Sequence, residues 1–266
     1  MHDDYKARSG LALMREQARV IDALIIREIY TRFGRENIGF LWIFAEPALF
    51  CLGVVALWSI TQHSNHKEIS LVAFVVTGYM PLIVFRHIIT RLLRCMQSNA
   101  PLLYYRQVTV MALYLARIWL EIISASATFA VLMVLFYLLD IIDPPADYPK
   151  MFFAWLLYCW FSAALGMTIG AIAERSEIVE KLWTPVSYIM IPFSGTFYML
   201  YWLPQGFREA LLWSPQVSGV EMLRSGYFGE GIQSYYSVPY LVGMTLVLTC
   251  VGLYLVSRAR EHIEVD

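Results

Sequence analysis

Charged residues are scarce in this chain. Lys, Arg, Asp and Glu make up only 15% of its 266 residues, while hydrophobic residues make up 59%, and the mean hydropathy is +0.56. Because soluble domains carry about 25% charged residues, this composition excludes an ordinary soluble domain and indicates an integral membrane protein. The formal net charge of −1 also argues against a nucleic-acid partner, which would need an excess of basic residues.

The chain also lacks the short motifs of several enzyme classes. It contains no Gly-rich phosphate loop ending in Lys-Ser or Lys-Thr, no His-Glu-x-x-His and no Gly-x-Ser-x-Gly. His63 and His66 have no third ligand nearby, and the four cysteines show no paired spacing, so neither a metal site nor a disulfide framework is indicated. We expect the chain not to be an enzyme by itself and to hold no cofactor.

Apolar and charged residues alternate at helical spacing before the first long apolar run. Apolar residues recur at steps of three and four over 11–33, while Arg15, Arg19 and Arg27 fall between them. The pattern predicts an amphipathic helix in the headgroup plane, with its arginines near anionic lipid. We interpret 1–39 as a cytosolic amphipathic segment.

Six apolar runs follow, each near the ~20 residues that a helix needs to cross a membrane. They lie at 40–60, 70–89, 108–139, 151–173, 183–203 and 238–257. We expect an all-α membrane protein with a single transmembrane domain over 1–266, a six-span core at 40–257 and a cytosolic tail at 258–266.

Positive charge is distributed unequally between the two sides of these predicted spans. If the spans alternate, only Lys67, Lys150, Arg208 and Arg224 fall on one side, and the other Lys and Arg residues fall on the opposite side. The positive-inside rule then places both termini of this multi-pass protein in the cytosol.

The cytosolic stretch after the second run contains a helix stop and restart at Asn99-Ala100-Pro101. Pro101 is suited to the first turn of a helix, which predicts a short interfacial helix. Its residues are Leu102, Leu103, Tyr104, Tyr105 and Arg106. A passive cytosolic turn is the alternative.

The exterior stretch 204–236 is long but mostly apolar. Ser214-Pro215 divides it, and Ser218 with Glu221 has the spacing of a capping box that would open a second short helix, which stops near 226–231. We interpret the stretch as two helices that re-enter the bilayer from outside, surrounded by protein.

Charges inside the spans are few. Glu46 lies in the first span, and Arg117 and Glu121 are one turn apart early in the third span, so they can form an intramembrane ion pair. Alternatively, Arg117 snorkels to the cytosolic interface. Without a chain of acidic or histidine residues in any span, a proton-coupled transporter is disfavoured.

Aromatic and small residues form two stripes at helical spacing. Phe193, Phe197 and Tyr201 repeat every four residues in the fifth run, and such aromatic faces suit the apolar faces of sugar rings. We predict that they face a translocation path, with ordinary helix packing as the alternative. Small residues at 162, 166 and 170 predict close helix packing in the fourth span.

Several motifs resemble those of the capsular-polysaccharide export permeases of Gram-negative bacteria, which are membrane subunits of ABC-2-type exporters. The residues are Arg32-Phe33-Gly34-Arg35 through Gly39, Trp42, Glu46-Pro47, Thr77-Gly78-Tyr79 with Pro81, Phe85-Arg86, and the segment from Trp213 to Phe228. The match runs nearly end to end. Exporters of O-antigen and teichoic acid share this architecture.

The resemblance implies an ABC-2 exporter fold in the bacterial inner membrane and a homodimer of this chain. Two copies of a separate ABC ATPase subunit would bind ATP and Mg. The substrate would be a lipid-linked capsular polysaccharide, moved from cytosol to periplasm, and a periplasmic co-polymerase and an outer-membrane polysaccharide exporter would complete the route.

The resemblance also implies roles for particular residues. The stretch 102–107 would be the helix that couples the chain to its ATPase. Arg32 and Arg35 would contact the phosphate of the lipid terminus, or simply the headgroups as in any amphipathic anchor. The substrate channel is assigned to Trp42, Glu46, Phe193, Phe197 and Tyr201.

Two alternatives stay open for the function. Within the same class, the substrate would be an O-antigen or teichoic-acid type polymer, or a lipid or drug-like amphiphile. In a different class, the chain would be a passive channel or a membrane scaffold with no nucleotide-binding partner.

Overall fold

The computed structural model describes residues 10–33, 45, 48–54, 56–57, 70–105 and 107–259, and every regular element in these ranges is helical. The longer helices are α1 (Gly10–Phe33), α3 (Leu71–Leu92), α5 (Val110–Leu138), α6 (Tyr148–Ala173), α7 (Glu177–Ile189), α9 (Pro215–Phe228) and α10 (Val238–Ala259). The short ones are η1 (Gln97–Asn99), α4 (Ala100–Leu103), η2 (Ile191–Phe193), η3 (Leu200–Trp202), α8 (Gln205–Leu211) and η4 (Gly229–Gly231). The predicted all-α class is confirmed over these residues.

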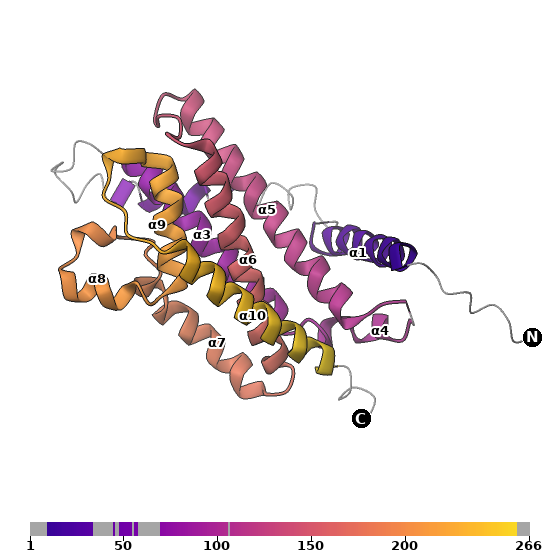
Figure 1. Cartoon of the computed structure of the whole chain (residues 1–266). Helices are drawn as coiled ribbons and strands as arrows, with labels where there is room; N and C mark the ends of the chain where they lie inside the picture. Colours follow the sequence, from indigo (N-terminus) through magenta and orange to yellow (C-terminus); the bar gives the residue numbers. More distant parts are fainter. Residues whose placement is uncertain are drawn as a thin grey trace, which may run out of the picture.

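Helix α6 lies at the centre of the molecule. It packs against α3, α9 and α10, while α5 packs against α3 and α1 packs against α5. Figure 1 shows α3, α5, α6 and α10 running alongside one another, with α1 beside the lower half of α5. The helix predicted over 11–33 is therefore formed, and it contacts the bundle.

Among the described residues, four helices are long and apolar enough to cross a membrane. They are Leu71–Leu92, Val110–Leu138, Tyr148–Ala173 and Val238–Arg258, and they match the second, third, fourth and sixth predicted runs. The first run, 40–60, lies largely outside the described residues, and its parts at 48–54 are helical.

Side-chain caps begin three of these helices. Ser70, Thr109 and Asp147 each accept a hydrogen bond from the backbone N–H three residues later, over 3.5, 3.1 and 2.9 Å respectively. Such caps satisfy backbone donors that the first helical turn leaves without partners. Polar residues at the boundaries of the apolar runs therefore set where these spans begin.

The fifth predicted run, 183–203, is not one continuous helix, and this prediction is wrong. Helix α7 ends at Ile189, η2 follows, and turns and extended backbone separate η2 from η3. Pro192 has no backbone N–H, and Gly195 has a φ of 77°, so neither continues an α-helix. Apolar residues on both sides of the break outweighed the Ser194-Gly195-Thr196 turn signal and therefore concealed it.

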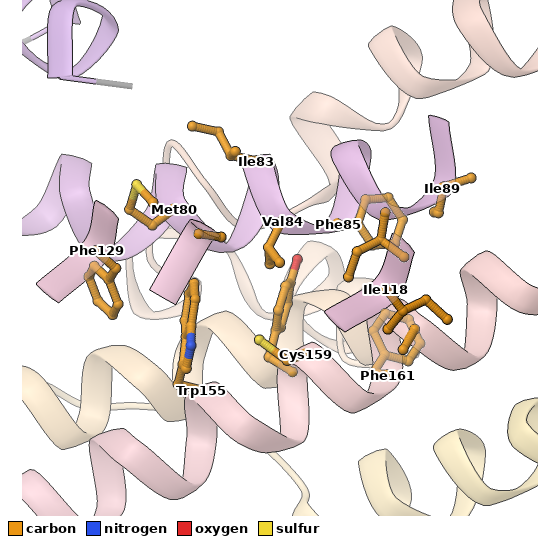
Figure 2. Packing of buried hydrophobic residues seen from close by; sticks show 14 of the residues in the cluster. Met80, Ile83, Val84, Phe85, Ile89, Ile118, Phe129, Trp155, Cys159 and Phe161 are labelled. Carbon is orange, nitrogen blue, oxygen red and sulfur yellow. The ribbon is translucent and has the colours of Figure 1, made fainter. Parts of the chain in front are cut away.

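The small-residue stripe of α6 packs against α3, which identifies the partner of this predicted seam. A Cβ at Gly166 would lie 2.8 Å from Ile88 Cγ2, and a Cβ at Gly170 would lie 3.0 Å from Leu92 Cβ. Figure 2 shows α3 side chains lying against Trp155 of α6 and its neighbours. The two glycines permit a separation between helices that larger residues would prevent.

The substitution Gly170→Val should therefore destabilise the chain. The added carbons would force α3 and α6 apart, at a cost of about 1–3 kcal/mol. Gly243→Val is the matched control, because nothing lies within 4 Å of a Cβ at Gly243 of α10. Thermal unfolding of the purified variants in detergent measures the effect. Equal melting temperatures for the two variants would contradict the packing described.

Candidate functional site

A fully buried arginine on α9 ties together three parts of the chain. Arg224 Nη1 donates hydrogen bonds to the carbonyl oxygens of Gly195 (2.7 Å) and Tyr198 (2.6 Å), and Nη2 donates to that of Thr196 (2.6 Å). The guanidinium carbon also lies 4.1 Å from the ring centroid of Phe74 in α3. A buried cation is tolerated only where such partners surround it. Arg224 thus fastens the turn after η2 to α9 and α3.

Glu221 binds the backbone on either side of α9. Its side chain is buried, and its carboxylate accepts hydrogen bonds from the N–H groups of Leu200 (3.0 Å) and Tyr235 (3.3 Å). The predicted capping box is therefore wrong. Helix α9 begins at Pro215, and Glu221 accepts hydrogen bonds from residues outside the helix. We name Glu221 and Arg224, with the backbone groups they bind, the outer cluster.

A glycine of α3 makes room for this cluster. A Cβ at Gly78 would lie 2.5 Å from Arg224 Nη2 and would collide with the carbonyl group of Thr196. This close approach accounts for the glycine in the Thr77-Gly78-Tyr79 motif that the sequence singled out. Two motifs distant in the sequence, in α3 and α9, therefore meet at one site.

The aromatic residues predicted as a stripe do not share one helical face. Phe193 ends η2 and is exposed, Phe197 lies in the bend that follows, and Tyr201 lies in η3 with its ring 5.7 Å from that of Trp202. The break that interrupts the fifth run also removed the four-residue repeat. Two other predicted channel residues, Trp42 and Glu46, lie outside the described residues.

At the predicted cytosolic end, α4 forms the short helix expected after the second span. It begins with Pro101 in its first turn, which confirms the predicted restart, and it ends at Leu103, earlier than predicted. Leu102 and Leu103 are partly buried, whereas Tyr104 and Tyr105 are 90% and 67% exposed. Arg106 and Arg35 lie outside the described residues, as does the side chain of Arg32.

Three helices hold the segment that leads into α4. Arg27 of α1 donates to Asn99 Oδ1 (2.9 Å). Glu174, which follows α6, accepts a hydrogen bond from the Met96 N–H (2.7 Å), and Arg94 pairs with Glu180 of α7. Burial raises the pKa of the Glu174 carboxyl to about 7, against the lowering effect of that N–H. We name the segment 94–105 the coupling segment.

Arg117 does not pair with Glu121, so this prediction is wrong. Arg117 Nε lies 3.7 Å from Glu28 Oε1 of α1, and Nη2 donates to Ser98 Oγ (2.7 Å). Glu121 Oε1 instead lies 3.7 Å from Arg91 Nε of α3. Neighbouring helices therefore supply the partners of both residues, and Arg117 becomes one more link between α1 and the coupling segment.

The role of Arg224 was not predicted from the sequence, where this residue counts only as an exterior positive charge. The signal was present, because Arg224 and Glu221 are one turn apart in a short and otherwise mostly apolar helix. Charges in such surroundings are costly and generally have a specific use. A sequence pattern could not show that Arg224 binds carbonyl groups in a turn distant along the chain.

Replacing Arg224 with Lys should destabilise the chain although it keeps the charge. A single ammonium cannot reproduce the fork that binds Gly195, Thr196 and Tyr198, and a buried carbonyl left without a donor costs about 1–3 kcal/mol. Arg175→Lys makes the same chemical change at an exposed position. Thermal unfolding of both purified variants should show a lower melting temperature for Arg224→Lys alone. If Arg224→Lys has the same melting temperature as the native chain, the hydrogen bonds of Arg224 do not stabilise the chain as described.

Comparison with known proteins places these features in a family. Residues 19–228, a range that includes the coupling segment and both side chains of the outer cluster, match the family described as ABC-2 type transporter. The chain is 40% identical over 248 residues to the capsule polysaccharide export inner-membrane protein CtrC of Neisseria meningitidis serogroup B. It is 38% identical over 248 residues to the capsule polysaccharide export inner-membrane protein BexB of Haemophilus influenzae.

These two alignments cover 93% of this chain and 94% of each relative. A third relative, the polysialic acid transport protein KpsM of Escherichia coli, is 30% identical over 264 residues, which cover 96% of this chain and 98% of the relative. The family resemblance found in the motifs is thus confirmed over nearly the whole length. The chain belongs to the ABC-2 type transporter family.

Proposed function

We propose that this chain is the membrane-spanning permease subunit of an ATP-driven exporter that moves lipid-linked capsular polysaccharide from the cytosol to the periplasm. The observation that carries the proposal is the identity of 38–40% over 93% of the chain to proteins named for capsule polysaccharide export. Apolar helices long enough to cross a membrane support it. The location would be the bacterial inner membrane.

A separate ABC ATPase subunit would supply the energy and bind ATP and Mg, because this sequence has no phosphate-binding loop of its own. The exposed Tyr104 and Tyr105 offer it an aromatic contact, and aromatic residues often carry much of an interface's binding energy. The coupling segment behind them is held by α1, α6 and α7. If the ATPase displaced these tyrosines, the contacts of the coupling segment would therefore transmit the displacement to three helices.

The proposed topology has six crossings, and α7 with the irregular backbone that follows it makes the fifth in place of one continuous helix. Both termini would lie in the cytosol, and α8 and α9 would re-enter from the periplasmic side. Every residue of α9 from Gln216 to Tyr227 is buried. A helix that is enclosed by protein, polar residues included, can lie at membrane depth without exposing charge to lipid. The outer cluster supports this placement, because it satisfies irregular backbone that lipid could not.

Two copies of the chain would form the translocation path. Helices α5 and α10 expose apolar side chains, Val131, Val134, Leu246 and Val247 among them, which suit lipid or a second copy. Phe193, Phe197, Tyr201, Trp42 and Glu46 remain the proposed channel residues. Arg32 and Arg35 are proposed to contact the lipid phosphate.

The proposed assembly contains further partners. A periplasmic co-polymerase and an outer-membrane polysaccharide exporter would receive the polymer after it leaves this chain. Without the permease, the polymer would be made but would have no route across the inner membrane. The location of the polymer therefore distinguishes a permease from a polymer-synthesising component.

Deletion of the gene should accordingly abolish surface capsule and leave polymer inside the cell. Quantifying capsular sugar in surface extracts and in lysates measures both pools, and restoring the gene should return the polymer to the surface. A passive scaffold would not be required for this transfer. Unchanged surface capsule in the deletion strain would refute the proposed function.

Replacing Tyr104 and Tyr105 together with Asp should weaken ATPase binding. Two carboxylates in a largely apolar contact must be desolvated without partners, which costs several kcal/mol at an interface. Tyr148→Asp, at an exposed position at the opposite end of α6, is the control. Co-purification of the ATPase with the tagged chain is the measurement. If the double variant co-purifies with as much ATPase per chain as the control does, these tyrosines do not lie at the interface.

A further inference from the structure

Two cavities lie next to each other along the segment that connects α9 to α10. The first has a volume of about 410 Å³ and is lined largely by aromatic residues, Trp213, Tyr235, Tyr236 and Tyr240 among them. The second has a volume of about 500 Å³ and is lined by polar residues that include Asp147, Lys150 and Glu230. Ser234 and Tyr236 line both cavities. The two cavities therefore adjoin, and we call the pair the cleft, with an aromatic half and a polar half.

Contacts with neighbouring groups hold the rings of the aromatic half in place. The Tyr240 hydroxyl donates to the Trp213 carbonyl oxygen (2.6 Å), and the two rings meet edge to face, 6.4 Å apart. Arg208 lies over the Tyr235 ring, 4.3 Å from its centroid. The Trp213 side chain is nevertheless 78% exposed. A rigidly held, exposed aromatic surface of this kind suits the apolar face of a sugar ring.

The polar half offers donors and acceptors at the edge of that surface. Lys150 Nζ lies 5.5 Å from the centroid of the Tyr236 ring and donates to Ser225 Oγ (2.6 Å). Ser234 Oγ is buried and has no hydrogen-bond partner among the described residues. The carboxylate of Glu230 is available to accept from further hydroxyls.

We propose that this cleft binds a sugar unit of the exported polysaccharide where the polymer leaves the chain on the periplasmic side. The proposal rests on the proposed function and topology. Aromatic faces for stacking, interleaved with hydroxyl, ammonium and carboxylate groups, match a hydroxyl-rich ring and not a purely apolar partner. Each cavity lies within the range of about 300–1,000 Å³ that is usual for small-molecule sites.

The cleft is also placed to respond to the outer cluster. Tyr235, which lines its aromatic half, donates its N–H to Glu221, and Ser225, which lines its polar half, follows Arg224 directly. A sugar bound here would contact the same loop that the cluster fixes. Binding at the exit would therefore depend on the conformation of the re-entrant helices.

The test uses the full-length chain in lipid nanodiscs and short oligosaccharides prepared from the capsule of its own host. Ligand-observed NMR gives the dissociation constant. Trp213→Ala and Tyr236→Ala should each weaken binding by roughly 3- to 10-fold, the usual value of one aromatic contact. Trp213→Phe keeps an aromatic face and should bind nearly as the native chain does. Because Trp213 is mostly exposed, its truncation leaves the core intact.

Tyr254→Ala is the matched control, since Tyr254 is an exposed tyrosine on α10 that lines neither cavity. Absence of binding to the native chain, or equal binding by Trp213→Ala and Tyr254→Ala, overturns the cleft assignment. The deletion strain separates this from the wider proposal. Lost surface capsule without oligosaccharide binding refutes the cleft alone, whereas normal surface capsule in that strain refutes the proposed function.

Discussion

The guanidinium of Arg224 is the group on which the part of the molecule around α9 depends. The chain breaks its helix near Pro192 and Gly195, and the carbonyl groups of the turn that follows have no helical partners. Arg224 supplies donors to them from α9 and stacks on Phe74 of α3. One side chain therefore replaces the hydrogen bonds that a continuous fifth helix would have made. Without it, these carbonyl groups would lack partners, which the membrane depth proposed for them would make especially costly.

Helix α6 connects this outer cluster to the coupling segment. At one end, the N–H groups of Ala146 and Asp147 donate to carbonyl groups of α9, over 2.9 Å each. At the other end, Glu174 accepts from Met96. Between them, glycines bring α6 close to α3. Under the proposed function, this closely packed helix with a contact at each end would connect the proposed ATPase contact mechanically to α9.

The sequence predicted elements whose determinants are local. Apolar length was enough for α3, α5, α6 and α10, helical periodicity for α1, and Pro101 for α4. Three features were missed, and two of them depend on distant residues. The break near Gly195 has local signals in Pro192 and Ser194-Gly195-Thr196, which the apolar residues around them outweighed. By contrast, the partners of Arg117 come from α1 and the coupling segment, and the carbonyl groups bound by Arg224 are brought together only by folding. The predicted roles of Trp42, Glu46, Arg35 and Arg106 concern positions outside the described residues and stay predictions.

Polymer transfer through this chain, powered by a separate ATPase, is the central claim, and transport into inverted inner-membrane vesicles tests it most directly. Lipid-linked capsular polysaccharide labelled in its sugars is added outside the vesicles, and the label protected in the lumen is counted with and without ATP. The account predicts ATP-dependent protection in vesicles that contain both this chain and its ATPase, and none when this chain is absent. Protection that persists without this chain would contradict it.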